Sequence, residues 1–268
     1  MDTLHVRSGL SSEGRSTKAI AATAGFARAA RRDSRTPIII ALAFVLAGSL
    51  GAFAHVVEDY LTGDPLVDWD VRFALWLHER ASDPLIGLFK VITLAGNAAV
   101  LGLVSAAAAF VLLRRGRAND AALVLLSLGG AGLLNAAFKL AFQRPRPESA
   151  FVQLDAYSFP SGHAAASTAA FLAAAFLAAT RVRGLRRRSG IVLTALVAAA
   201  AVAFSRLYLG AHYLSDVLAG SSLGLAWTTV CLILYVAYGR RDVLDLLPAR
   251  IRRRLESIKG DQGATVPR

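Results

Sequence analysis

Six long apolar runs limit what this chain can fold into. Five of them are close to the roughly 20 helical residues that cross the hydrocarbon core of a bilayer, and the second is long enough to be tilted or to project beyond it. The runs cover residues 37–57, 85–113, 121–142, 162–180, 191–208 and 215–238. Hydrophobic residues make up 55% of the 268 residues, which is more than an ordinary soluble domain of this length carries. No alternating strand pattern competes with these runs. The sequence therefore predicts an all-α polytopic membrane bundle with six transmembrane helices in a domain over 37–240.

Positive charge predicts the orientation of the bundle. Of the 30 lysines and arginines, 23 lie in the two tails and in the connections after the second and fourth runs. The positive-inside rule places these segments, and with them both termini, in the cytoplasm. The protein is then a multi-pass protein of the plasma or inner membrane. The polar segments 143–159 and 209–214 face the periplasm or cell exterior.

The net charge of +12 does not indicate a nucleic-acid partner. Such proteins carry their basic residues on a soluble scaffold, interleaved with aromatic side chains. Here the arginine clusters separate apolar runs, which is typical of membrane topology. We expect the lipid bilayer to be the main surrounding of the chain, and the sequence makes no prediction of oligomeric state.

The segments outside the six runs are expected to stay at the membrane surface or in solution. Residues 1–36 form a basic cytoplasmic tail that we expect to be disordered, with a short basic helix around 18–32. Residues 58–83 predict an outer loop with a short amphipathic helix, and 241–268 a basic amphipathic tail on the inner leaflet. The Ala-Phe-Ala stretch 52–54 resembles a signal-peptide cleavage site, but the long polar stretch before it favours a retained helix.

Three polar segments lie at the outer ends of the last four runs. The first contains Lys139 and Arg146, the second is the Pro-Ser-Gly-His segment 160–163, and the third runs from Arg206 through Asp216. Three cations without an equal number of acids require an anion, and the fork of an arginine fits phosphate oxygens. Ser161 and Gly162 stand at a helix start, where free N–H groups also favour an anion. The sequence predicts one anion site.

Two histidines supply groups that could react. His212 and Asp216 are four residues apart, so they can share one face if that stretch is helical. A carboxylate on one ring nitrogen fixes the tautomer and leaves the other nitrogen free to attack. His163 has no acid beside it in the sequence, which suits a general acid for a leaving oxygen. Cys231 is a single cysteine, so it forms neither an intrachain disulfide nor a metal cluster.

The three segments together resemble a known family. Lys-x6-Arg-Pro, Pro-Ser-Gly-His and Ser-Arg-x5-His-x3-Asp match the three-part signature of the type 2 phosphatidic acid phosphatase family, which also contains vanadium haloperoxidases. The resemblance covers roughly residues 37–240, and the six-span layout is similar to that of bacterial membrane members. Arg144 is an additional Arg-Pro arginine that the spacing leaves without a role.

The resemblance implies a metal-independent phosphatase without a cofactor that acts on a membrane lipid phosphate. A phosphohistidine intermediate follows, with His212 as nucleophile, Asp216 as its orienting acid and His163 as the acid and then the base. The residues implied in phosphate binding are Lys139, Arg146, Ser161, Gly162 and Arg206. The substrates suggested are undecaprenyl diphosphate, phosphatidic acid and phosphatidylglycerol phosphate, with the polyprenyl diphosphate narrowly first.

Other interpretations remain open at the level of sequence. Taken singly, each motif fits a structural role: a turn before a helix, a lysine or arginine at a span end, or a hydrogen-bonded His–Asp pair. Their order, spacing and common face favour one site. A lipid head-group phosphotransferase would use the same residues, a haloperoxidase would be soluble, and an anion or lipid transporter could also carry intramembrane charges.

Overall fold

The fold was examined in a computed structural model of the full chain. The structure describes residues 36–63, 65–148, 150–152 and 157–238, and every regular element in these ranges is a helix. The bounds are α2 Thr36–Thr62, α3 Pro65–Glu79, α4 Asp83–Leu94, α5 Ala98–Arg114, α6 Ala118–Phe142, α7 Gly162–Ala179, α8 Leu185–Tyr208 and α9 Leu214–Tyr238. The predicted tails, the basic helix at 18–32 and the amphipathic tail lie outside the described residues, apart from residue 36.

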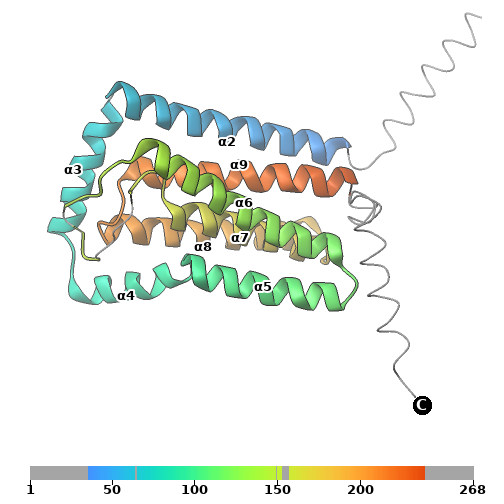
Figure 1. The fold of residues 1–268 in the computed structure, drawn as a ribbon. Coiled ribbons are helices and arrows are strands. Elements are labelled where there is room, and N and C mark those ends of the chain that lie inside the picture. The colour runs from blue at the N-terminus through green and yellow to red at the C-terminus, as the bar shows by residue number, and fades with distance from the viewer. Residues whose placement is uncertain (1–35, 64, 149, 153–156, 239–268) are drawn as a thin grey trace, which may run out of the picture. The chain divides into compact units, whose positions relative to one another are not determined.

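Six helical segments are long and apolar enough to cross a membrane, with α4 and α5 counted together as one span of 32 residues. Residues 42–238 belong to one compact unit, in which the long helices run side by side and α3 lies across one end (Figure 1). This confirms the all-α, six-span prediction. The first span continues to Thr62, five residues beyond the predicted end, and the fifth begins at Leu185, six residues earlier than predicted.

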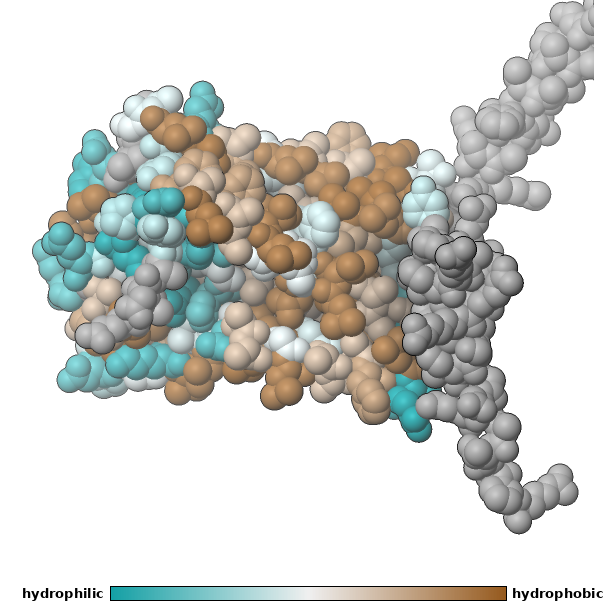
Figure 2. All heavy atoms as spheres, in the orientation of Figure 1, coloured by the Kyte–Doolittle hydropathy of each residue, from teal (hydrophilic) through white to brown (hydrophobic). Residues whose placement is uncertain are grey.

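The flanks of the bundle are hydrophobic. Large apolar side chains such as Phe44, Leu103 and Leu133 are each about three-quarters exposed. Figure 2 shows hydrophobic residues along the length of the helices and hydrophilic residues gathered at the α3 end. In water such a surface would cost free energy, whereas lipid chains solvate it. The protein is therefore a multi-pass membrane protein.

Helix α7 packs against α6, α8 and α9 through small side chains. Its buried face is mostly alanine, and α9 presents glycines to it. A Cβ atom at Gly224 would lie 2.4 Å from the carbonyl oxygen of Ala165, and one at Gly220 would lie 2.3 Å from that of Ser161. In membranes, small residues of this kind allow close approach of helix backbones. The approach brings the start of α7 onto the first turns of α9.

The second span is interrupted, which the apolar pattern did not predict. Residues 95–97 separate α4 from α5. The side chain of Asn97 caps α5, because its Oδ1 accepts hydrogen bonds from the N–H groups of Ala99 and Val100, at 2.9 and 3.3 Å. A Cβ at Gly96 would collide with Val202 at 2.3 Å and would lie 3.4 Å from the Cβ of His163. The interruption therefore lets this span lie directly against the start of α7.

The close packing of α7 on α9 makes a testable prediction. We expect Gly224→Ala to destabilise the protein by about 1–3 kcal/mol, because the new methyl group meets backbone that cannot move aside. Gly129→Ala is the matched control, since nothing lies within 4 Å of a Cβ there. Denaturant titration in mixed micelles measures both, and equal stabilities of the two variants would contradict this packing.

Candidate active site

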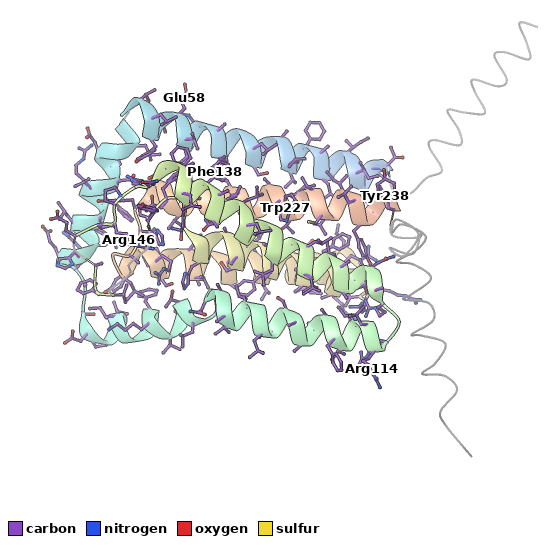
Figure 3. The ribbon with its side chains drawn as sticks, in the orientation of Figure 1. Glu58, Arg114, Phe138, Arg146, Trp227 and Tyr238 are labelled. Atoms are coloured by element: carbon purple, nitrogen blue, oxygen red, sulfur yellow. The ribbon has the colours of Figure 1, made fainter. Side chains whose placement is uncertain are left out.

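The loop after α6 delivers the first group of cations. Helix α6 ends at Phe142, and Gln143 adopts a left-handed conformation with φ of 46°, which turns the chain into the proline-containing segment that follows. Lys139 donates hydrogen bonds from Nζ to the carbonyl oxygens of Tyr157 and Ser158, the second at 3.3 Å. Arg146 lies at the α3 end of the bundle, far from Arg114 (Figure 3). The lysine ammonium and this arginine therefore meet at one end of the protein.

The Pro-Ser-Gly-His segment opens α7 and is held from two sides. On one side, Asn135 of α6 donates from Nδ2 to the carbonyl oxygen of Pro160 at 3.1 Å. On the other, the N–H of Ser161 donates to the carbonyl oxygen of Asp216 at 2.9 Å. Ser161 is completely buried, and its Oγ finds no hydrogen-bond partner among the described residues. A buried hydroxyl at a helix start is suited to an anionic ligand.

His212 and Asp216 lie in the turn between α8 and α9. His212 Nδ1 is 3.4 Å from Asp216 Oδ2, which also accepts the N–H of Tyr213 at 2.9 Å. A shared helix face requires the stretch from His212 to Asp216 to be helical. In fact α9 begins only at Leu214, and a left-handed Gly210, with φ of 64°, makes the turn that brings the ring back over the first turn of the helix. The carboxylate assigns the proton to Nδ1 and leaves Nε2 as an acceptor.

Two arginines flank the histidines. Arg146 Nη1 lies 3.2 Å from His212 Nε2 and donates to the carbonyl oxygen of Ala211 at 2.5 Å. Arg206, at the end of α8, is almost completely buried and donates from Nη1 to Thr93 Oγ1 of α4 at 2.9 Å. Its Nε is buried and unpaired among the described residues. An unpaired donor on a buried guanidinium is costly without an anion to accept from it.

His163 belongs to the same cluster. Its side chain packs on the interruption of the second span beside Gly96, and it lies within electrostatic range of His212, Lys139, Arg146 and Arg206. The two imidazoles therefore occupy one region rather than two. The structure thus brings together every residue that the sequence singled out, namely Lys139, Arg146, Ser161, Gly162, His163, Arg206, His212 and Asp216.

Sequence reasoning missed several residues that build this region. Arg144 was left without a role, yet it is buried and forms ion pairs with Asp216 and with Asp70 of α3, at 2.8 and 2.9 Å. The only sign of its importance in the sequence was that its Arg-Pro pair directly precedes that of Arg146. Asp70, Asn135 and Thr93 carry no motif, because each acts through a contact that only the folded chain creates.

Burial lowers the pKa of two groups of the site that lie in the loops between the long helices. Desolvation lowers the pKa of His212 to about 4, although its hydrogen bond and charge interaction with Asp216 act in the opposite direction. Burial also lowers the pKa of the Arg146 guanidinium, again opposed by Asp216. At neutral pH the ring of His212 is therefore uncharged, and its Nε2 lone pair is available to attack an electrophile.

The arrangement can bind a tetrahedral anion and transfer part of it. Guanidinium and ammonium groups, with the N–H groups at the start of α7, neutralise the equatorial oxygens. One imidazole is oriented for attack, and the other lies where it can exchange a proton with a leaving oxygen. Among the described residues, no three His, Cys, Asp or Glu side chains are grouped as metal ligands.

Comparisons with known proteins identify a similar family and a similar sequence. The family model described as PAP2 superfamily matches residues 120–240. Phosphatidylglycerophosphatase B of Bacillus subtilis is 37% identical over 108 residues, which cover 40% of this chain and 53% of that protein. The match thus spans about half the length of this relative.

A solved structure is also similar. The transmembrane PAP2-type phosphatidylglycerolphosphate phosphatase from Bacillus subtilis superposes with a TM-score of 0.61 at 26% identity. The superposition covers 71% of this chain and 94% of the other. The helical bundle is therefore shared well beyond the segment that carries the motifs.

The lowered pKa of His212 makes a stability prediction. The unfolded ring has a pKa near 6.5, so its neutral folded form stabilises the protein fully above that pH and progressively less as the pH falls toward 4. We expect the wild type to lose about 2 kcal/mol more than His212→Gln between pH 7 and pH 5. Denaturant titrations at the two pH values measure the difference, and parallel losses would show that His212 is not buried in its neutral form.

Anion binding is tested with orthovanadate, which resembles phosphate. We expect it to stabilise the wild type by about 2.7 kcal/mol at a hundredfold excess over its Kd. Arg206→Gln should raise that Kd about tenfold or more, because a charge-assisted donor is lost. Arg72→Gln, an exposed arginine of α3, is the control and should leave the Kd unchanged. Equal Kd values in all three proteins would remove Arg206 from the anion site.

Proposed function

Since the chain carries a PAP2 superfamily domain over residues 120–240, we propose that it is a membrane lipid phosphate phosphatase that works through a phosphohistidine intermediate. One observation supports this most directly. His212 has Nδ1 beside Asp216 and Nε2 3.2 Å from Arg146, within one cluster with His163, Lys139 and Arg206. A nucleophile held between an orienting acid and phosphate-binding cations is the arrangement that phosphoryl transfer to histidine requires.

In the first step of the proposed reaction, Nε2 of His212 attacks the phosphorus atom in line with the leaving oxygen. Lys139, Arg146 and Arg206 neutralise the charge that spreads over the equatorial oxygens, together with the start of α7. His163 donates a proton to the departing alkoxide or phosphate oxygen. Asp216 stabilises the positive charge on the ring through Nδ1.

In the second step, water attacks the phosphohistidine. His163, now neutral, removes a proton from this water, and the P–N bond to His212 breaks. Inorganic phosphate leaves and the original protonation states return. The same neutral His163 would serve a lipid head-group acceptor in place of water, so the identity of the acceptor separates hydrolysis from transfer.

The substrate class follows from where the cluster lies. The catalytic groups stand among transmembrane helices, so a substrate can keep its chains in the bilayer and place only its phosphate between the arginines. The names of the similar sequence and of the similar structure, both from Bacillus subtilis, refer to phosphatidylglycerol phosphate. We therefore place this lipid first in a substrate panel that also contains undecaprenyl diphosphate and phosphatidic acid.

The proposed orientation places the site on the outer face of the plasma or inner membrane, with both termini in the cytoplasm. Arg114, at the end of α5, lies at the opposite end of the bundle from Arg146 (Figure 3). The basic connections after the second and fourth spans share that opposite end, as the positive-inside rule requires for cytoplasmic segments. Labelling of single introduced cysteines with a membrane-impermeant thiol reagent tests this, after Cys231→Ser.

The decisive measurement is release of inorganic phosphate by purified protein in detergent with a chelator present. We expect turnover of at least one lipid in the panel, and a fall of about 10⁴-fold or more in His212→Ala, which lacks the nucleophile. Asp216→Asn should lower kcat roughly 10³-fold. His55→Ala, an exposed histidine of α2, is the control.

Each result has a clear meaning. Full activity in His212→Ala would overturn the phosphohistidine mechanism. Turnover that requires an added lipid acceptor would indicate a transferase, and an absence of phosphate release from every lipid would leave an anion or lipid transporter as the interpretation.

A further inference from the structure

A carboxylate of helix α3, at the end of the bundle, contacts residues next to Asp216 in the candidate active site. Asp70 is completely buried. It accepts hydrogen bonds from the N–H of Ser215 at 2.8 Å, from Ser215 Oγ, and from Arg144 Nη2 at 2.9 Å. Burial of a carboxylate is costly unless it is paired and fully hydrogen-bonded, and this one meets both conditions. The α3 helix is thus tied to the first turn of α9 by charge as well as by packing.

Arg144 connects this carboxylate to Asp216. Its Nη1 donates to Asp216 Oδ1 at 2.8 Å and to Ser215 Oγ at 2.6 Å. Its guanidinium lies over the rings of Tyr60 and Tyr213, at 4.8 and 4.3 Å from their centroids. These contacts fix the orientation of the guanidinium group, because its plane is held between two aromatic rings while its nitrogens bind two carboxylates.

The two oxygens of Asp216 therefore have separate partners. Oδ1 is taken by Arg144, while Oδ2 faces His212 Nδ1 and the N–H of Tyr213. Rotation of the carboxylate would break both sets of contacts. Arg144 thus determines which oxygen is presented to the histidine.

The net charge of the cluster also indicates that its members influence His212. Arg144 alone would cancel the negative charge of Asp216 and remove its benefit to a positively charged imidazole. With Asp70 included, two carboxylates and one guanidinium leave a net charge of −1 behind His212. Asp70 thereby restores the negative charge that a phosphohistidine intermediate needs on its Nδ1 side.

We propose that Asp70, Arg144 and Ser215 are positioning residues that act on the reaction through Asp216, so that helix α3 is part of the catalytic apparatus. This rests on the proposed phosphatase function. A purely structural network would only attach α3 to the bundle, and its loss would lower stability without a specific effect on kcat.

Asp70→Asn tests the proposal, because it keeps the shape of the side chain and removes its charge. We expect kcat to fall about 10- to 100-fold, as for other residues that orient a reacting group, with KM changed less than twofold. Asp68→Asn is the matched control: the same substitution on the same helix at an exposed position. It should leave kcat, KM and the unfolding midpoint unchanged.

A double-mutant cycle with Asp216→Asn separates positioning from structure. If Asp70 acts through Asp216, the double variant should be no slower than Asp216→Asn alone. Multiplicative losses, or a kcat for Asp70→Asn within twofold of the wild type, would overturn the proposal.

Ser215→Ala provides a second route if Asp70→Asn does not fold. It removes one hydroxyl that links Arg144 to Asp70, and we expect a kcat loss of several-fold that also disappears in the Asp216→Asn background. An unchanged kcat would overturn the proposal in the same way. Wild-type activity that is lost in His212→Ala establishes the function independently, so a negative result at Asp70 or Ser215 would count against the positioning role alone.

Discussion

The contact between the start of α7 and the first turns of α9 is the constraint on which the site depends. The N–H of Ser161 donates to the carbonyl oxygen of Asp216, and Gly220 has no side chain that would separate the two backbones. The two histidines come from opposite sides of this contact. A single added methyl group at its centre would therefore move one imidazole away from the other. The small residues of α7 and α9 thus hold the two histidines near each other, and they also suit helix packing in lipid.

The charges at the α3 end of the bundle are only partly compensated within the protein. Three site cations stand around the two histidines, and two buried carboxylates stand behind them with Arg144 between. In a medium of low dielectric an isolated member of this set would be expelled or neutralised. The carboxylates and Arg144 satisfy one another, whereas Arg206 Nε and Ser161 Oγ have no partner among the described residues. An anionic group is therefore expected to bind on the side of these two unpaired atoms.

Much of this protein could be predicted from its sequence. The six apolar runs predicted the spans because hydrocarbon thickness imposes a length on each of them. The three motifs predicted a common site because their residue types share one chemistry. Asp70 could not be found in this way. It is an ordinary acidic residue of an amphipathic helix, and only the path of the chain after Thr62 brings it beneath Ser215. The interruption at Gly96 was also not predicted, since hydropathy does not register the change over residues 95–97 to hydrogen bonds that reach back three residues instead of four.

Helix α7 has 18 residues, whereas α6, α8 and α9 have 24 or 25. At 1.5 Å per residue it is about 27 Å long, a little less than the apolar thickness of a bilayer. Its first turn carries Gly162 and His163. In the proposed phosphatase, the reacting phosphorus therefore meets the protein slightly beneath the head-group plane. A water-soluble ester would have to shed its hydration to descend that far, while an amphiphile anchored in the leaflet already holds its phosphate near this depth. In the proposed phosphatase, a helix about two turns short thereby favours molecules that arrive from within the membrane.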